Sequence, residues 1–152
     1  MSWPRAELDP VARLRVLAAA LPHASFEERV IEAPFERVWS YIEDMERGVP
    51  QFEGNVRRLR VVRREGERLW LESEGALGLT LRMQAVLRPG WCVMETASGS
   101  VQIGMAACAE GPGRTHFAHF EGSRWLGRLA RPLFRRFVRR DLASLARLAE
   151  QE

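Results

Sequence analysis

A short helical segment, residues 33–52, interrupts a chain of otherwise strand-like segments, of which residues 25–32 are the first. Pro34 lacks a backbone N–H, which costs nothing in the first turn of a helix. Apolar residues then recur at helical spacing at Val38, Trp39 and Ile42. Gly48 and Pro50 are expected to end the segment within about four turns. Short helices inserted after a first strand, with a further helix at the end of the chain, predict a curved sheet that helices enclose.

Six further strand-like segments follow this insert, and short turns join them to one another. They are residues 55–64, 68–75, 77–88, 91–97, 101–109 and 114–121. The alternation is clearest in 77–88, where Leu79, Leu81 and Met83 are separated by single polar residues. Short connections join antiparallel neighbours, so these segments predict an antiparallel sheet.

From Trp125 onward the apolar period changes from two residues to about 3.6, which predicts one long C-terminal helix. Its apolar face is formed by Leu126, Leu129, Ala130, Leu133, Phe134, Phe137, Leu145 and Leu148. Pro132 lies on the opposite face among arginines and is expected to open or kink the helix. The whole pattern predicts an α+β fold with a curved seven-stranded antiparallel sheet, a two-helix insert after the first strand and a long C-terminal helix.

An additional helix is predicted at residues 9–21, because Asp9 and Pro10 form a helix-start signal and an apolar stripe follows them. At 152 residues the chain is expected to form a single domain, 1–152, with 25–150 as its core. A composition of 46% hydrophobic and 28% charged residues is typical of a globular protein and argues against disorder.

Several short motifs in this order resemble the SRPBCC superfamily, also called START-related or helix-grip proteins. They are Ala33-Pro34, Val38-Trp39, Ile42, Asp44 and Pro50-Gln51-Phe52, supported by Leu126-Gly127-Arg128 before the last helix. The resemblance covers residues 25–150 and is to a polyketide cyclase/dehydratase-like member, although the helix at 9–21 is not part of the usual pattern. It implies the helix-grip arrangement, in which the curved sheet is wrapped around the long C-terminal helix, with a cavity between them that holds a small apolar molecule. Members of the superfamily include cyclases, aromatases and lipid-transfer proteins, so the fold does not determine the function.

The residues expected to face this cavity are mainly apolar, with few polar groups among them. They are Phe52, Leu71, Leu79, Leu81, Met83, Met105, Phe117, His119, Phe134, Phe137 and Asp141. The same pattern is expected if the apolar members simply fill the core. No residue is assigned a catalytic role.

His119 and Asp141 are the polar residues of this set. His119 shares its strand face with Phe117, whereas His116 points to the other side of the sheet. An inward histidine could donate a hydrogen bond to a ligand or act as an acid or base. It could also simply be hydrogen-bonded at the cavity rim. Asp141 falls within the apolar stripe of the last helix, where a carboxylate needs a partner or a raised pKa. It could orient a ligand hydroxyl, bond His119 or an arginine of the sheet, or form a structural pair.

The leading functional prediction is a cytoplasmic protein that binds a small apolar or amphipathic molecule, such as a lipid, polyketide or isoprenoid-like compound. The first alternative is an enzyme of the cyclase/dehydratase type that uses the same cavity, with His119 as acid or base. The second is a macromolecular interaction protein that uses the Arg-rich face of residues 124–140. Residues 124–152 carry eight arginines and three acidic residues, but no exposed aromatics are interleaved for base stacking, which disfavours nucleic acid as the partner.

No cofactor or metal is predicted, because the sequence contains no phosphate-binding loop and no metal-ligand spacing. Cys92 and Cys108 lie in strand-like segments without CxxC spacing and are interpreted as reduced, half-buried thiols of a cytoplasmic protein. No apolar run approaches the roughly 20 residues that span a bilayer.

The convex face of the sheet is expected to be unusually apolar. Its residues in the later strands are Gly104, Ala106, Cys108, Ala118 and Phe120. An exposed antiparallel sheet face is normally polar, so this face is predicted to be covered. The cover is either the helix at 9–21 or a second subunit in a homodimer.

Overall fold

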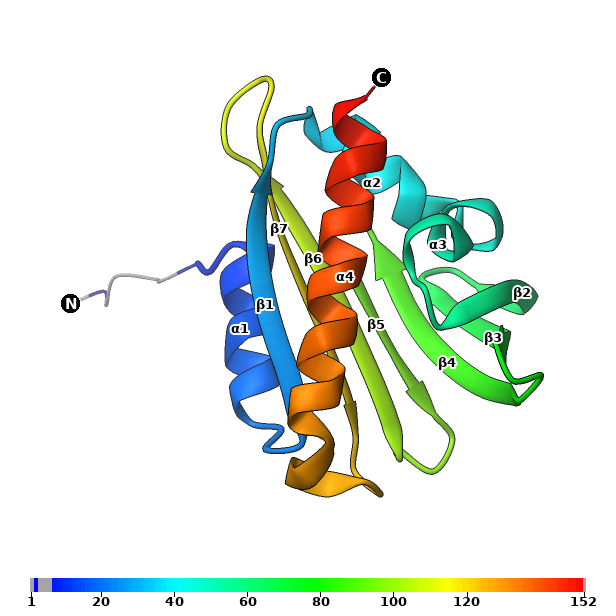
Figure 1. The fold of residues 1–152 in the computed structure, drawn as a ribbon. Helices are drawn as coiled ribbons and strands as arrows, with labels where there is room; N and C mark the ends of the chain where they lie inside the picture. The colour runs from blue at the N-terminus through cyan, green and yellow to red at the C-terminus, as the bar shows by residue number, and fades with distance from the viewer. Residues whose placement is uncertain (1, 3–6, 152) are drawn as a thin grey trace.

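One antiparallel sheet organises the computed structural model, which describes residue 2 and residues 7–151. Its strands are β1 (Ala24–Ile31), β2 (Val56–Glu65), β3 (Arg68–Gly75), β4 (Thr80–Arg88), β5 (Trp91–Thr96), β6 (Val101–Ala109) and β7 (Thr115–Ser123). Their order in the sheet is β1-β7-β6-β5-β4-β3-β2, so the first strand returns beside the last and the others form a meander. The sheet is strongly curved, and the predicted α+β class with seven antiparallel strands is confirmed (Figure 1).

A long helix, α4 (Arg131–Glu150), crosses the concave face of this sheet (Figure 1). It begins later than the sequence pattern indicates, because a 3-10 turn, η1 (Gly127–Ala130), precedes it and Gly127 has a φ of 64°. Pro132 lies in the first turn of α4, where a missing N–H is tolerated, so it opens the helix and does not kink it. The described part of the chain contains no helix long and apolar enough to span a bilayer.

The insert after β1 consists of two helices, α2 (Phe35–Glu43) and α3 (Met45–Phe52), that meet at Asp44. The expectation that Gly48 and Pro50 end the helical segment is wrong, since both lie inside α3. The break falls at Asp44 because its side chain accepts a hydrogen bond from the N–H of Arg47 and so caps a new helix. Gly48 has a packing role: a Cβ there would lie 1.9 Å from the backbone oxygen of Tyr41.

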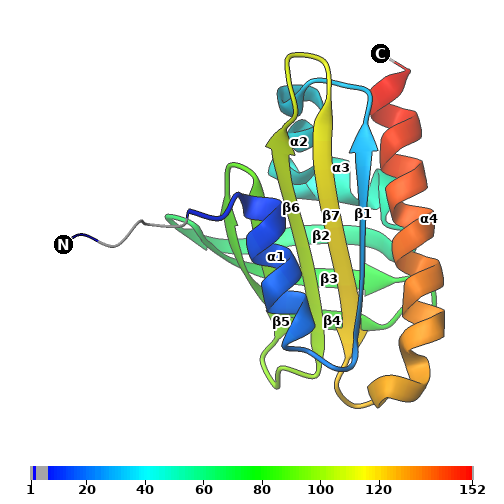
Figure 2. The same cartoon turned by 90° about the vertical axis from the view of Figure 1, so that its left-hand side faces the viewer.

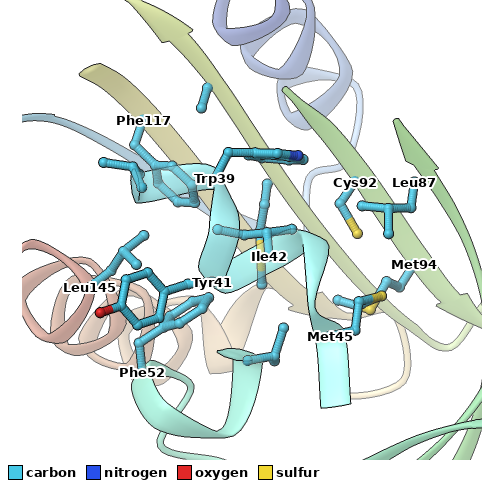
Figure 3. Packing of buried hydrophobic residues seen from close by; sticks show 14 of the residues in the cluster. Trp39, Tyr41, Ile42, Met45, Phe52, Leu87, Cys92, Met94, Phe117 and Leu145 are labelled. Atoms are coloured by element: carbon cyan, nitrogen blue, oxygen red, sulfur yellow. The ribbon is translucent and has the colours of Figure 1, made fainter. Parts of the chain in front are cut away.

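The main core lies between the concave face of the sheet and the helices α2, α3 and α4. Figure 3 shows Trp39, Ile42 and Phe52 from the insert meeting Phe117 of β7 and Leu145 of α4. All five are at most 4% exposed. The insert therefore fills the half of the concave face that lies beside the C-terminal end of α4.

The convex face is covered by α1 (Pro10–Ala19), which lies across β6 and β7 (Figure 2). Val11 and Leu14 of this helix are fully buried against the small and aromatic side chains predicted for this face. Those side chains are Ala106, Cys108, Ala118 and Phe120. An ion pair of 2.8 Å between Arg15 and Glu28 also joins α1 to β1. The prediction that the convex face is covered is confirmed, and of the two covers that the sequence allowed the structure shows the extra helix.

Candidate functional site

Four ionisable side chains meet inside the protein, between the sheet and α4. His119 and Glu121 extend from β7, Glu53 follows directly after α3, and Asp141 lies in the middle of α4. Each of them is at most 4% exposed. The Nε2 atom of His119 lies 3.1 Å from Glu53 Oε1, 3.4 Å from Glu121 Oε1 and 3.5 Å from Asp141 Oδ2. We call these four residues the His119 cluster.

The imidazole ring of His119 is held in one orientation by the backbone of the neighbouring strand. Its Nδ1 atom lies 2.9 Å from the carbonyl oxygen of Gly104 on β6. A carbonyl oxygen only accepts, so Nδ1 must carry the hydrogen and donate it. The nitrogen that faces the three carboxyl groups, Nε2, is therefore the one that is free to gain or lose a proton or to bind a ligand.

Asp141 is held in a similar way through one of its two oxygens. Oδ1 accepts a hydrogen bond from the backbone N–H of Gly54 at 3.1 Å and lies 3.2 Å from the guanidinium of Arg140. Gly54 allows this approach, because a Cβ at that position would lie 2.5 Å from the guanidinium carbon of Arg140. The other oxygen, Oδ2, is left facing His119.

Several buried polar atoms of the cluster have no hydrogen-bond partner. They are both carboxyl oxygens of Glu53, Nε2 of His119 and Oδ2 of Asp141. The nearest cluster atoms lie close to Nε2 but not in hydrogen-bonding geometry. Unpartnered polar atoms are rare in protein interiors, because each costs about 1–3 kcal/mol of desolvation free energy. The cluster has the donor and acceptor capacity for a further polar group or ion.

The electrostatics of the cluster favour bound protons when nothing else compensates its charge. Burial, together with the negative charge of Glu121, raises the pKa of Glu53 to about 8. Burial alone would lower the pKa of His119, but the carboxyl groups of Asp141, Glu121 and Glu53 outweigh it and raise that pKa well above 6.5. The cluster can thus accept and release protons near neutral pH.

The apolar residues predicted to line a cavity divide into two groups. Phe52, Leu71, Met83, Met105 and Phe117 are at most 4% exposed and pack within the main core. The remaining apolar residues of the set do not belong to that core, and they are Leu79, Leu81, Phe134 and Phe137. The residues in the first group serve as structural packing in this conformation.

The second group marks one end of the concave face that the core leaves uncovered. On β4 the inward-facing positions are buried from Met83 onward, but Leu81 is 41% exposed, and Leu79 before the strand is 68% exposed. On α4, Leu133 is 48% exposed, and Phe134 and Phe137 are half-buried, with their rings edge to face at 6.0 Å. We call these five residues the apolar end.

The strand register places both sides of the apolar end at the same end of the sheet. Met83 of β4 pairs with Thr96, the last residue of β5, and Val101 at the start of β6 pairs with Ser123, the last residue of β7. Ser123 leads directly into η1 and α4. On β7, Glu121 precedes Ser123 and shares the inward phase of His119, so within the cluster it is the β7 residue nearer to the apolar end.

The hollows identified among residues 7–151 lie elsewhere, and none of them is lined by α4. One of about 430 Å³ lies on the convex side, beside the end of α1, and its lining includes Leu17, Leu21, Trp70, Gln84 and Phe120. None of these hollows is thus formed between the sheet and α4.

Both cysteines are free thiols; Cys108 is half-buried as the sequence predicted, whereas Cys92 is more deeply buried than expected. Cys92 is fully buried, and burial raises its pKa to about 12, so its thiol is not a nucleophile at neutral pH. Cys108 is partly buried beneath α1, where burial also raises its pKa. Neither cysteine belongs to the His119 cluster.

Sequence reasoning found two members of the His119 cluster and missed the other two. His119 was placed facing inward and Asp141 within the apolar stripe, and the structure brings them within 3.5 Å of each other. Glu121 carried a usable signal, since it shares the alternation phase of Phe117 and His119. Glu53 carried none, because its position depends on how the end of α3 packs against α4.

The basic face of α4 is partly engaged within the chain. Arg135 and Arg139 lie 3.7 and 3.1 Å from Glu27 of β1, and Arg140 bonds Asp141. These contacts attach the helix to the sheet edge formed by β1. They give several of the arginines a structural role that requires no macromolecular partner.

No protein-family model and no curated protein matches this chain. Solved structures do match it. A START superfamily protein from Mycobacterium smegmatis is 15% identical with a TM-score of 0.66, over 85% of this chain and 98% of that one. The Zhui aromatase/cyclase from a Streptomyces species is 14% identical with a TM-score of 0.64, over 84% and 93%. A protein from Thermus thermophilus is 22% identical with a TM-score of 0.65, over 84% and 97%.

These identities are all below 25%, so the likeness concerns the fold and does not extend to substrates or catalytic residues. The shared features are the curved antiparallel sheet and the long C-terminal helix across its concave face (Figure 1). The structural matches agree with the resemblance that the sequence motifs indicated. The chain has the START-like helix-grip fold.

Proposed function

We propose that the protein binds a small amphipathic molecule at the apolar end, with the polar part of that molecule directed toward the His119 cluster. The observation that carries this proposal is the exposure of inward-facing apolar side chains on both sides of the same end of the concave face. Leu81 of β4 is 41% exposed, although the same face of that strand is buried from Met83 onward. Phe134 of α4 is only half-buried, although Val138 and Asp141 are fully buried farther along the same helix face. An apolar molecule placed between them would remove this surface from water, which is favourable by about 25 cal/mol per Å².

The charge of the His119 cluster restricts the polar part of the ligand. Three carboxyl groups gather there around one histidine, and the cluster already binds protons to offset their charge, so an anionic head group would add a further buried negative charge that needs its own proton or cation. A hydroxyl group can donate to a carboxylate, and it can also accept from a protonated carboxyl group or imidazolium. We therefore propose a ligand with an apolar body and a neutral hydroxyl group rather than a fatty acid.

A second candidate, an enzyme of the cyclase type, is favoured by the same histidine. Nε2 of His119 lies near three carboxyl groups that can exchange protons with it, and proton transfer is the chemistry that such a reaction requires. One of the structures with the same fold is an aromatase/cyclase. Binding precedes reaction in either case, so the binding proposal is tested first.

Native mass spectrometry of the untagged protein, purified without detergent, tests the binding proposal. We expect a fraction of the wild-type protein to carry an apolar, hydroxyl-bearing small molecule. Leu81→Glu should remove this species, because it places a charge in the apolar end. Val16→Glu is the matched control, since Val16 is 62% exposed on α1 and far from the concave face.

Two outcomes would count against the proposal. One is a wild-type protein that remains free of ligand even after incubation with 1-decanol. The other is a bound molecule that Leu81→Glu retains and Val16→Glu loses, because that pattern would place the ligand on the convex side of the sheet.

A further inference from the structure

We propose that the His119 cluster is a binding site for a divalent transition-metal ion, with Glu53, His119, Glu121 and Asp141 as the protein ligands. No sequence motif indicates a metal, because the four residues come from three separate segments with no recognisable spacing. The fold brings one potential ligand atom of each residue within 4.8 Å of the others. The proposal does not depend on the binding of a small molecule at the apolar end.

The spacing of the ligand atoms fits a first-row metal ion. Zinc bound by nitrogen and oxygen ligands has metal–ligand distances of about 2.0–2.2 Å, so adjacent ligand atoms in a tetrahedral site are about 3.3–3.6 Å apart. Nε2 of His119 lies 3.1, 3.4 and 3.5 Å from the three carboxyl oxygens. The carboxyl oxygens lie within 4.8 Å of one another, so an ion at the centre would draw those that are farther apart together by up to about 1 Å.

The contacts around the cluster are those that orient metal ligands. A metal-binding histidine usually donates its other ring nitrogen to a carbonyl or carboxylate, which fixes the tautomer. Nδ1 of His119 does this with Gly104. Asp141 uses Oδ1 to accept from Gly54 and Arg140 and leaves Oδ2 directed into the cluster. Each of these two side chains is fixed through one polar atom, Nδ1 or Oδ1, and directs its second polar atom, Nε2 or Oδ2, into the cluster.

The unpartnered atoms are those that an ion would bind. Nε2 of His119, Oδ2 of Asp141 and both oxygens of Glu53 are buried without hydrogen bonds. A dication at the centre would accept electron pairs from these atoms and would also offset the mutual repulsion of the carboxylates. A purely structural hydrogen-bonded network would be expected to satisfy these atoms through the protein itself.

The donor set restricts the kind of ion. One imidazole and three carboxylates, without a thiolate, suit Zn²⁺, Mn²⁺ or Fe²⁺ better than Cu⁺, which prefers sulfur. Ca²⁺ takes six to eight oxygen ligands, which is more than this enclosed group provides. Zn²⁺ and its spectroscopic substitute Co²⁺ are therefore the appropriate probes.

The test uses full-length, untagged protein, because a histidine tag would bind metal itself. The cluster is enclosed, so the protein is unfolded in guanidinium chloride with a chelator and refolded with Zn²⁺, Mn²⁺ or Co²⁺ before gel filtration. We expect one ion per chain by elemental analysis. We also expect visible absorption of bound Co²⁺, and a higher unfolding temperature than that of the chelated protein.

Glu53→Gln is the test variant, because it keeps the shape of the side chain and removes its charge. We expect it to weaken metal binding about 100-fold or more while circular dichroism shows that the fold is retained. His116→Gln is the matched control. His116 is partly exposed and also lies near two carboxylates, at 3.0 Å from Glu28 and 3.8 Å from Glu110, so its loss should leave binding unchanged.

The proposal is overturned if the refolded wild-type protein retains none of the three ions after gel filtration. It is also overturned if Glu53→Gln binds metal as tightly as the wild type, or if His116→Gln is the variant that loses it. Should Glu53→Gln fail to fold, Glu121→Gln replaces it, and the Co²⁺ spectrum of the wild type decides independently whether nitrogen and oxygen ligands hold the ion.

Discussion

At the scale of single residues, the character of the site depends on which proton His119 carries and which it can exchange. The Gly104 carbonyl fixes a hydrogen on Nδ1. Changes in the protonation state of the cluster therefore occur at Nε2 and at the carboxyl groups around it. Burial raises the pKa of Glu53 to about 8, whereas an unperturbed glutamate has a value of 4.5. In the metal-free protein the folded state therefore binds these protons more tightly than the unfolded state does.

This difference predicts the sign of the pH dependence of stability. A carboxyl group whose folded pKa is raised loses stabilisation as pH rises from its unfolded pKa to its folded one, here from about 4.5 to about 8. His119, with its raised pKa, contributes stability below about 6.5 that is lost as pH rises through its folded pKa. Both residues act in the same direction, toward lower stability at higher pH.

Urea unfolding of the chelated protein between about pH 5 and about pH 8 measures this effect. We expect the free energy of unfolding to fall by at most about 1.4 kcal/mol per pH unit for each proton released. Glu53→Gln should show a shallower decline, because glutamine does not titrate. A wild-type stability that rises across this range, or a decline that Glu53→Gln leaves unchanged, would contradict the assignment.

At the scale of elements, the two insert helices depend on a close backbone contact. Gly48 of α3 packs against the backbone of Tyr41 in α2, and this contact lets Trp39, Ile42 and Phe52 reach the core together (Figure 3). The end of α3 then carries Glu53 into the His119 cluster. The position of a site residue is thus set by the packing of two helices.

Gly48→Ala should therefore destabilise the protein. Its Cβ would lie 1.9 Å from the Tyr41 oxygen, and because this is backbone the two helices must separate. We expect a loss of about 2–3 kcal/mol, measured by chemical unfolding. Gly113→Ala is the matched control, since nothing lies within 4 Å of the Cβ position there, and it should change stability by less than about 0.5 kcal/mol. Equal effects of the two substitutions would show that the α2–α3 contact is not limiting.

The element scale also separates what the sequence could predict from what it could not. The strands follow from period-two alternation and turn residues, and most of their observed bounds lie within two residues of the predicted ones. The internal boundary of the insert was mispredicted, because Gly48 and Pro50 act through tertiary packing and are tolerated within α3. In the same way, the stripe from Leu126 to Ala130 has helical spacing but forms a 3-10 turn around Gly127.

The candidate site also contains residues that the sequence could predict and residues whose position depends on tertiary packing. His119 and Asp141 were predicted from periodicity alone, since each is a polar residue in an inward phase of its element. Glu53 was not predictable, because it belongs to no periodic segment and reaches the cluster only through the arrangement of α3 and α4. Local patterns specify which way a side chain faces, whereas the meeting of three segments is a property of the tertiary fold.

At the scale of the whole molecule, the two faces of the sheet are completed differently. On the convex face α1 covers the small and aromatic residues of β6 and β7 (Figure 2). On the concave face α2 and α3 cover one half (Figure 1). The side chains of the apolar end, in the other half, remain partly exposed. The His119 cluster lies between the filled and the uncovered parts. This order, from apolar end to polar cluster to packed core, is the basis of the binding proposal.

A titration of the methyl-labelled protein with 1-decanol, followed by two-dimensional NMR, tests the binding proposal at the site itself. We predict saturable shifts of the Leu79, Leu81 and Leu133 methyl groups, and weaker binding of decanoate, which has the same chain with an anionic head group. Leu17 and Leu21, which line the hollow on the convex side, should not shift. Shifts confined to Leu17 and Leu21, or no saturable shift at all, would contradict the proposal that the apolar end is the ligand site.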